Sequence, residues 1–165
     1  MRAVSARDMV LTRQGLRFAG HVWPCSIGRG GVRTDKREGD GATPIGTWPF
    51  RMVYFRPDRG PPPETGLKTA PLNETDGWCD APGDPAYNRP VTVPYPASHE
   101  VMWREDSLYD IVVVLGHNDA PPVPGHGSAI FMHVARDGYL PTEGCVALKR
   151  ADLEQVLAGV KEGDA

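Results

Sequence analysis

The longest uninterrupted apolar run in the chain is Ile111 to Leu115, with the sequence Ile-Val-Val-Val-Leu. A short, β-branched, continuously apolar segment predicts a β-strand from Asp110 to Leu115 that lies at the centre of a sheet and is covered on both faces. The same run is far too short to cross a bilayer as a helix, so no membrane span is expected. A chain of 165 residues is long enough to bury one core around this strand, which predicts a single domain, 1–165.

The other predicted elements are short strands separated by long loops. Glycine (19 residues) and proline (17 residues) are abundant but follow no period, which favours this arrangement over a helical bundle. Residues 56–100 are proline-rich and show no sustained period, which predicts a long excursion from the body of the domain. The alternation and turn residues predict further strands at Met9 to Thr12, Leu16 to Trp23, Phe50 to Phe55 and Ala129 to Val134.

One helix is predicted, near the C-terminus. Leu153, Val156, Leu157 and Val160 follow the i, i+3, i+4, i+7 spacing of a helix with one apolar face. Asp152 lies at the end of this segment where the helix dipole favours a negative charge. The expected fold class is therefore mainly β, with long loops and a C-terminal helix packed on the sheets.

Charge and cysteine usage exclude some classes of protein. The formal charge of -3 disfavours a generic nucleic-acid groove. Cys25, Cys79 and Cys145 form no CxxC pair and no zinc-finger spacing, so no structural metal is expected. Pairing of Cys25 with Cys79 stays open. The N-terminus has no apolar core of a secretory signal, which leaves an unusual export route, a trimmed chain or a cytoplasmic location.

A thiol and an imidazole are predicted to meet at the ends of two apolar segments. His133 ends the run Phe131-Met132-His133, and Cys145 opens the run Gly144-Cys145-Val146-Ala147-Leu148. A cysteine nucleophile needs a base from elsewhere in the chain, and adjacent strands can supply it. A free thiol titrates near pKa ~8.5, so we expect His133 and the following helix N-terminus to lower the pKa of Cys145. The alternative is a buried strand cysteine without chemistry.

Several neighbours are candidates for binding a substrate or its oxyanion. A glycine at 144 lets an acyl group approach, and the backbone N–H groups of Gly144 and Cys145 are candidates for stabilising a tetrahedral oxyanion. Other positions near predicted strand ends could line the cleft, or could instead make structural hydrogen bonds. These candidate substrate-binding residues are His117, Asn118, Ser128, Thr142 and Glu143.

The remaining charged and aromatic residues have two readings each. The basic residues of the 28–46 loop could receive peptide carboxylates or form a solvated charged loop; they are Arg29, Arg33, Lys36 and Arg37. His126 is expected to be an exposed loop residue, and Trp78 and Trp103 are expected to be packing anchors. A zinc site of His117, Asp119 and His133 is conceivable, but no HExxH helix supports it.

Three segments in order resemble the L,D-transpeptidase catalytic (YkuD-like) family of peptidoglycan enzymes. They are Asp40-Gly41-Ala42-Thr43-Pro44-Ile45-Gly46, Phe131-Met132-His133 and Thr142-Glu143-Gly144-Cys145-Val146, and the resemblance runs from about residue 28 to residue 157. It implies a YkuD-like β-sandwich in which Cys145 is the nucleophile and His133 the base, with no metal or organic cofactor. The implied substrates are peptidoglycan stem peptides: a tetrapeptide donor loses D-Ala, and an acceptor amine at position 3 or, unusually, position 1 forms the cross-link.

Two departures from the family pattern keep other functions open. Glu143 replaces an imidazole found in many members; it would raise the pKa of the thiol if it pointed inward, so we expect it to point outward, toward the acceptor ammonium. Ala147 replaces a polar residue. The alternatives are a non-catalytic cell-wall-binding module and a cysteine amidase or L,D-carboxypeptidase. The resemblance also implies a periplasmic or cell-wall-facing protein, and a monomer is expected.

Overall fold

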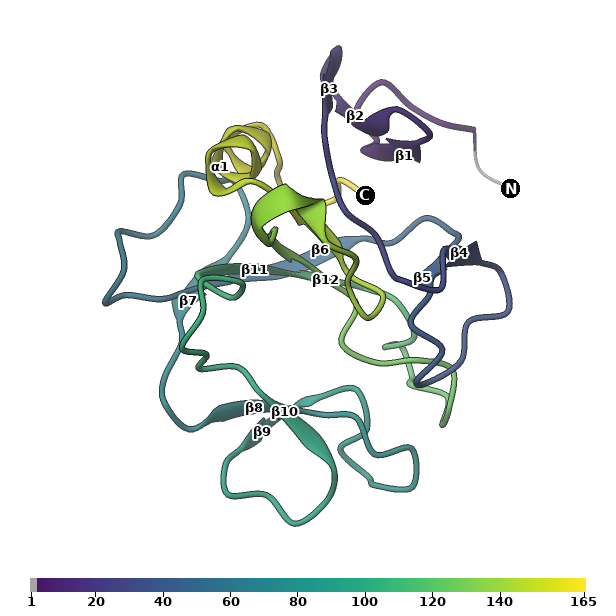
Figure 1. Cartoon of the computed structure of the whole chain (residues 1–165), viewed down its shortest axis with the longest axis vertical. Coiled ribbons are helices and arrows are strands. Elements are labelled where there is room, and N and C mark those ends of the chain that lie inside the picture. The colour runs from purple at the N-terminus through teal and green to yellow at the C-terminus, as the bar shows by residue number, and fades with distance from the viewer. Residues whose placement is uncertain (1–2) are drawn as a thin grey trace.

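The computed structural model describes residues 3–165, and its centre is a five-stranded sheet with the order β13-β12-β11-β6-β7 (Figure 1). The strand β11 lies in the middle, between the antiparallel neighbours β6 and β12, so the prediction of a central strand is confirmed. The outer strands β13 and β7 run parallel to β12 and β6. The bounds are β6 Phe50–Phe55, β7 Thr69–Pro71, β11 Ile111–Leu115, β12 Phe131–Val134 and β13 Val146–Leu148.

Both faces of this sheet are buried, which explains the continuous apolar run in β11. Ile111 and Val113 point into one core cluster, whereas Val112 and Val114 point into a second one on the opposite face. Successive side chains of a strand point to opposite faces, so a strand covered on both sides needs an apolar residue at every position. We call these two sides of the central sheet the helix face and the excursion face, after what covers each.

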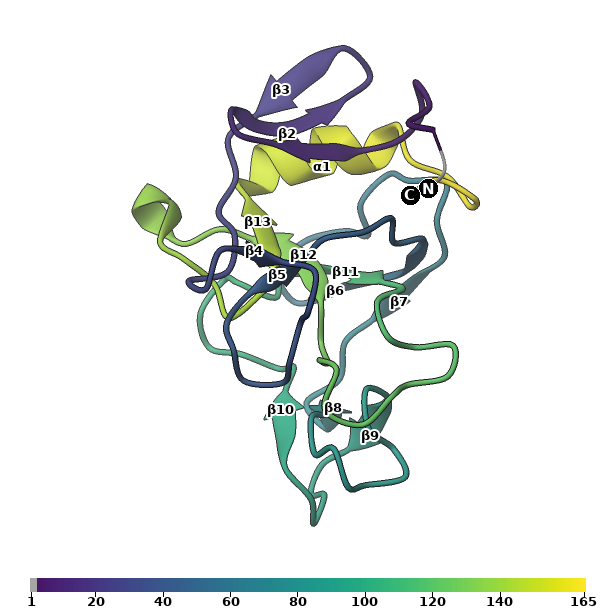
Figure 2. The ribbon, with the colours of Figure 1, turned by 90° about the vertical axis from the view of Figure 1, so that its right-hand side faces the viewer.

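The helix face is covered by α1 and by a small N-terminal sheet (Figure 2). The helix buries Leu153, Val156 and Leu157, as its spacing predicted. The predicted segment Leu16 to Trp23 is two strands, because Ala19 and Gly20 adopt positive φ values of 49° and 81° and turn the chain. The bounds are α1 Arg150–Ala158, β1 Val10–Thr12, β2 Gly15–Phe18 and β3 His21–Trp23.

The excursion face is covered by a second small sheet built from the proline-rich segment 56–100 (Figure 2). This sheet was not predicted, because its strands have only three or four residues and carry no clear alternation. Trp78 anchors it to the central sheet, with its ring 5.0 Å from that of Phe131 in an edge-on arrangement. Trp103 packs under the Arg56 guanidinium, so both tryptophans are packing anchors as predicted. The bounds are β8 Asp76–Cys79, β9 Pro90–Thr92 and β10 His99–Val101.

The loop 28–46 lies at the edge of the body and contains a short parallel pair of strands, β4 Val32–Arg33 and β5 Thr43–Pro44. A single 3-10 turn, Asp137–Tyr139, lies between β12 and β13. The fold class is mainly β with one C-terminal helix packed on the sheets, as the sequence predicted. Within residues 3–165, no helix has the length and apolar character needed to cross a membrane.

Candidate active site

Cys145 and His133 lie on the same face of the central sheet, where β12 and β13 run parallel side by side. His133 in β12 is opposite Ala147 in β13, and Cys145 directly precedes β13. The backbone N–H of Phe131 donates to Cys145 Sγ at 3.4 Å, which fixes the sulfur beside the start of β12. Because alternate residues share a face, Phe131, His133 and Cys145 all point to the excursion face.

The thiol of Cys145 is buried and neutral. The residue is only 7% exposed, and Sγ donates to the Ala129 carbonyl oxygen at 3.2 Å. Burial, reinforced by the nearby Glu100 carboxylate, raises the pKa of Cys145 to about 12. The expected lowering of this pKa is therefore wrong. The helix dipole does not reach the thiol, because β13 separates Cys145 from the first residue of α1, Arg150.

His133 is a neutral imidazole with a defined tautomer. Its Nδ1 lies 2.9 Å from the carbonyl oxygen of Val134, which can only accept, so Nδ1 carries the proton and Nε2 is left as an acceptor. The side chain is 4% exposed, and burial lowers the pKa of His133 to about 4. A neutral base on the same face of the sheet as a neutral thiol could take the thiol proton during attack, rather than holding a preformed ion pair.

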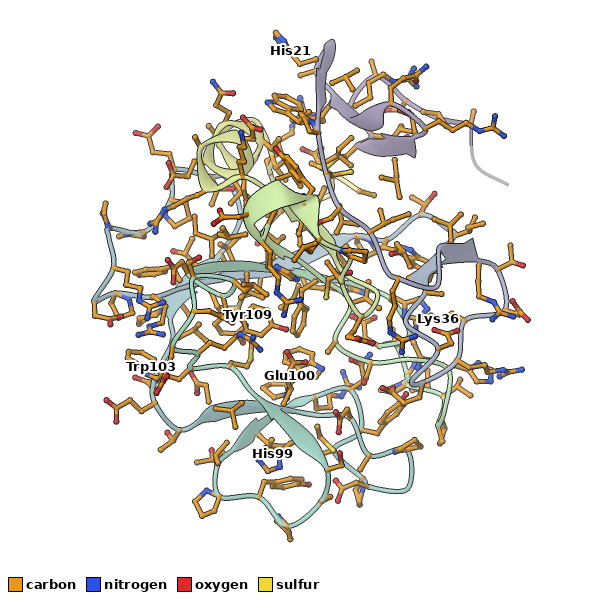
Figure 3. The ribbon with its side chains drawn as sticks, in the orientation of Figure 1. His21, Lys36, His99, Glu100, Trp103 and Tyr109 are labelled. Carbon is orange, nitrogen blue, oxygen red and sulfur yellow. The ribbon has the colours of Figure 1, made fainter. Side chains whose placement is uncertain are left out.

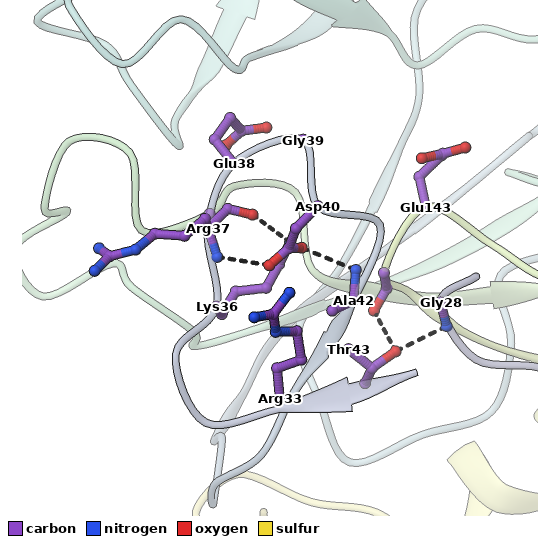
Figure 4. A network of polar contacts seen from close by, with 12 residues as sticks. Gly28, Arg33, Lys36, Arg37, Glu38, Gly39, Asp40, Ala42, Thr43 and Glu143 are labelled. Atoms are coloured by element: carbon purple, nitrogen blue, oxygen red, sulfur yellow. Dashed lines mark hydrogen bonds and ion pairs between the residues drawn. The ribbon is translucent and has the colours of Figure 1, made fainter. Parts of the chain in front are cut away.

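A hydrogen-bonded frame fixes the loop that carries the nucleophile. Thr142 Oγ1 donates to the Cys145 carbonyl oxygen at 2.6 Å and accepts the Gly144 N–H at 3.1 Å. Thr43 Oγ1 donates to the Gly144 carbonyl oxygen at 2.8 Å and accepts the Gly28 N–H at 2.9 Å (Figure 4). Thr142 thus has a structural role, and the Gly144 N–H must exchange this partner before it can serve an oxyanion.

Gly144 is required by the close approach of the 28–46 loop. Its φ is +136°, and a Cβ at this position would lie 2.8 Å from the carbonyl oxygen of Ala42. No side chain fits between the two loops without moving backbone. The turn around Thr43 and the loop around Cys145 therefore pack as one unit, which is why segments a hundred residues apart belong to one site.

Most of the basic residues of the 28–46 loop already have carboxylate partners. Arg29 pairs with Glu143 at 2.9 Å, and the Glu143 side chain is 78% exposed, so it points outward as predicted. Lys36 is buried and pairs with Asp40 at 2.5 Å. Arg33 pairs with Asp35, and the Arg37 guanidinium points away from Asp40 (Figure 4). These local pairs favour a structural role for the loop charges.

Asp40 is the centre of this loop. It accepts N–H groups from Arg37 and Ala42 in addition to the Lys36 ammonium (Figure 4). Burial by itself would raise the pKa of Asp40, but the Lys36 ammonium and the two backbone donors outweigh it and lower the pKa to about 2. An ionised Asp40 therefore organises the turn that holds Thr43 against Gly144.

The other predicted substrate-binding residues are tied into the same region. His117 is buried, its ring lies 4.7 Å from that of Trp48, and burial followed by the Lys36 charge lowers its pKa to about 4. Asn118 closes its own loop through bonds to Val123 and Gly127. Ser128 Oγ donates to Glu38 Oε2 at 2.8 Å. All three side chains have structural contacts, and their binding of substrate stays a prediction.

The remaining candidates are settled by exposure and distance. His126 is exposed, as expected. Within residues 3–165, no three His, Cys, Asp or Glu side chains are grouped closely enough to hold a metal ion, so the zinc alternative through His117, Asp119 and His133 is wrong. Cys25 and Cys79 are free thiols, so the disulfide that the sequence left open is not formed.

Two cavities flank the site without including it. A cavity of about 950 Å³ lies on the helix face, between the N-terminal sheet and the central sheet, and is lined by Cys25 and Met132 among others. A smaller one of about 450 Å³ on the excursion face is lined by Trp78 and Phe131. Cys145 and His133 line neither cavity. Both cavities reach chain neighbours of the site: Val146 lines the larger one, and Phe131, whose N–H bonds to the sulfur, lines the smaller one.

Two residues near the candidate site, Tyr109 and Glu100, belong to no sequence motif. The Tyr109 ring packs edge-on against the His133 ring, with 5.3 Å between the centroids, and the Tyr109 hydroxyl donates to Glu100 Oε1. Figure 3 shows both residues in the region between the central sheet and β8–β10. For Tyr109, the one clue in the sequence is that it directly precedes the segment predicted as the central strand. For Glu100, no such clue was identified in the sequence.

The fold and the paired thiol and imidazole define a β-sandwich domain with a cysteine-centred candidate site. A family model of the L,D-transpeptidase catalytic domain (YkuD) matches residues 4–165, essentially the whole chain. The chain belongs to this family, whose members generally are cysteine-dependent, act on peptidoglycan and face the cell wall. No curated protein and no solved structure matched the chain.

Proposed function

We propose that the protein is a peptidoglycan L,D-transpeptidase in which Cys145 is the nucleophile and His133 the general base. The observation that carries this proposal is that His133 in β12 and Cys145, just before the neighbouring β13, share one face of the sheet, with His133 Nδ1 bound to Val134 and Nε2 left to accept a proton. The donor is a tetrapeptide stem, and the acceptor is an amine of a second stem, at position 3 or, unusually, position 1.

The first half of the reaction forms an acyl-enzyme. As the sulfur attacks the carbonyl carbon before the terminal D-Ala, the thiol proton passes to His133 Nε2. Collapse of the tetrahedral adduct breaks the amide C–N bond, and His133 returns its proton to the leaving amine of D-Ala. The backbone N–H groups of Gly144 and Cys145 serve the oxyanion, with Gly144 released from Thr142.

The second half resolves the thioester. The acceptor amine attacks the acyl carbon and gives its proton to His133, and the proton then returns to the sulfur as the thioester bond breaks. The product is a cross-link with a free Cys145 thiol. Water in place of the amine gives a trimmed stem, which is the carboxypeptidase alternative at the same site.

The test is acylation of Cys145 by a carbapenem, followed by intact-mass measurement. Wild type is expected to gain one adduct, which peptide mapping places on Cys145, and Cys145→Ala is expected to gain none. Cys25, which lines the larger cavity, serves as the internal control thiol. An unmodified wild type, or an equal adduct on Cys145→Ala, would contradict the proposal.

Muropeptide profiles of cells that express the protein separate the remaining functions. New dimers support transpeptidation, whereas trimmed monomers without dimers support the cysteine carboxypeptidase or amidase. An unchanged profile together with a missing carbapenem adduct supports the non-catalytic cell-wall-binding module. Cells that express Cys145→Ala provide the background in each case.

A further inference from the structure

Glu100 brings a carboxylate into the region between the two sheets of the excursion face. The residue is in β10, opposite Trp78 of β8, and its Oε1 accepts the hydroxyl of Tyr109. Figure 3 shows Glu100 and Tyr109 as neighbours between the central sheet and β8–β10. The short β10 strand and the buried Tyr109 fix the direction in which the carboxylate points.

The Glu100 carboxylate forms no close ion pair among the described residues, although the charge of Arg104 acts on it. Among residues 3–165, no ion pair includes Glu100, and the nearby Arg104 is committed to Asp106 at 2.6 Å. The other charges that act on Glu100 are those of Asp80 and Glu38, so it lies among more anions than cations. Burial raises the pKa of Glu100, because the partly enclosed carboxylate loses more by desolvation than the Tyr109 hydroxyl and the Arg104 charge restore.

Glu100 is also coupled to both reacting side chains. Its partner Tyr109 packs on the His133 ring, and the carboxylate is the leading charged group that raises the pKa of Cys145. A cation bound at Glu100 would therefore act on the thiol through its charge. The cation would form the close ion pair that Glu100 does not make with a residue of the protein.

We propose that Glu100 binds a cationic group of the substrate, an ammonium of a peptidoglycan stem, beside Cys145. The inference rests on the proposed function for the identity of the substrate, but not for the presence of the cation site. Binding of the ammonium neutralises the carboxylate and removes a charge that disfavours the thiolate. The thiol is thus activated when the correct substrate is present, and Tyr109 is the positioning residue that holds the carboxylate.

The site can be tested with thiol reagents of different charge, whose relative rates are compared between wild type and variant. The sulfur of Cys145 attacks the sulfenyl sulfur of an alkyl methanethiosulfonate, forms a mixed disulfide and expels methanesulfinate. We expect the cationic aminoethyl reagent to react faster than the neutral methyl reagent, and the anionic sulfonatoethyl reagent to react slowest. Glu100→Gln, which still accepts the Tyr109 hydroxyl, should reduce the ratio of the aminoethyl to the methyl rate about tenfold.

Matched controls isolate the effect of Glu100. Glu105→Gln removes an exposed carboxylate nearby and should leave the ratio at Cys145 unchanged. The rates are read by mass spectrometry of the Cys145 peptide, and the Cys25 peptide of the same sample should show no change in ratio. Equal ratios in wild type and Glu100→Gln overturn the proposal. A flat charge order in wild type alone also overturns it, even if the variant does not fold.

Synthetic donor peptides then identify which ammonium binds. A tetrapeptide with lysine at its third position is compared with one carrying norleucine, and acyl-enzyme formation is followed by intact mass. A lysine preference that Glu100→Gln abolishes assigns the site to the donor. A preference seen only when an amine resolves the acyl-enzyme assigns it to the acceptor. Failure of the carbapenem test with the reagent preference intact would contradict the transpeptidase function but not the cation site.

Discussion

The two faces of the central sheet differ in what they bury, although the same strands supply both. On the helix face, β12 and β13 contribute Met132, Val134, Val146 and Leu148 to a purely apolar cluster under α1. On the excursion face, the same strands contribute His133 and Cys145, which lie near Tyr109 and Glu100. The helix face holds the strands in place, so that the excursion face can keep titratable groups in poorly solvated positions.

Among the substitutions considered, replacing His133 by alanine should have the largest effect, and the effect should be on the chemistry of the excursion face. We expect acylation of Cys145 to slow by about 10²–10⁴-fold, because the buried thiol loses the base that takes its proton. The rate is measured by intact mass with a carbapenem. Melting temperature and far-ultraviolet circular dichroism provide the control for folding. Unchanged acylation in a folded variant would remove His133 from the mechanism.

Leu153→Ala should produce the opposite pattern on the helix face. Leu153 is fully buried in the apolar cluster, so its truncation should lower the free energy of unfolding by about 2–5 kcal/mol. Urea denaturation measures the loss. The acylation rate per folded molecule should stay at the wild-type value, and a parallel loss of this rate would show that the two faces are not independent.

Asp40→Asn should show how much the ionised Asp40 carboxylate contributes to the free energy of unfolding. Because the folded pKa of Asp40 is lowered to about 2, its contribution is complete above the unfolded pKa of ~3.9 and is lost as the pH falls through the folded value. We expect the variant to lose about 2 kcal/mol of unfolding free energy at pH 7. Urea denaturation should show the gap between wild type and variant closing toward pH 2, and a gap that does not depend on pH would contradict this account.

Glu143→Gln should have the smallest effect on stability. The Arg29–Glu143 pair is largely exposed, so its loss should change the unfolding free energy by less than about 1 kcal/mol. A thermal melt at low and high salt checks this, since screening should remove even the small difference. A loss well above this range would show that the pair holds the nucleophile loop in place.

The sequence predicted the strands, the helix and the two main residues of the site better than it predicted the pKa of the thiol. The central strand and the C-terminal helix follow from local periodicity and were correct. Position and spacing also selected Cys145 and His133; in the structure His133 is in β12 and Cys145 directly precedes the neighbouring strand β13. The small β8–β10 sheet was missed, because strands of three or four residues leave no measurable period. Glu100 was missed for the same reason, since it lies in one of those strands.

The prediction of an acidic thiol failed for a different reason. A pKa depends on everything that surrounds the group, and Cys145 is enclosed by segments far away in the chain, including the one that carries Glu100. The expected helix N-terminus is displaced by the intervening strand β13. Sequence proximity to a helix therefore did not translate into electrostatic proximity.

What the sequence determined by itself is the alternation along each strand, which is fixed by backbone geometry and decides which side chains share a face. It thereby placed His133 on the face opposite Met132 and Val134, whereas the pairing of β12 with β13 put Cys145 on the same face as His133. The tertiary structure alone decided how dry that side is and which carboxylate lies near the thiol. These properties arise from the packing of distant segments, and no local pattern of residues encodes them.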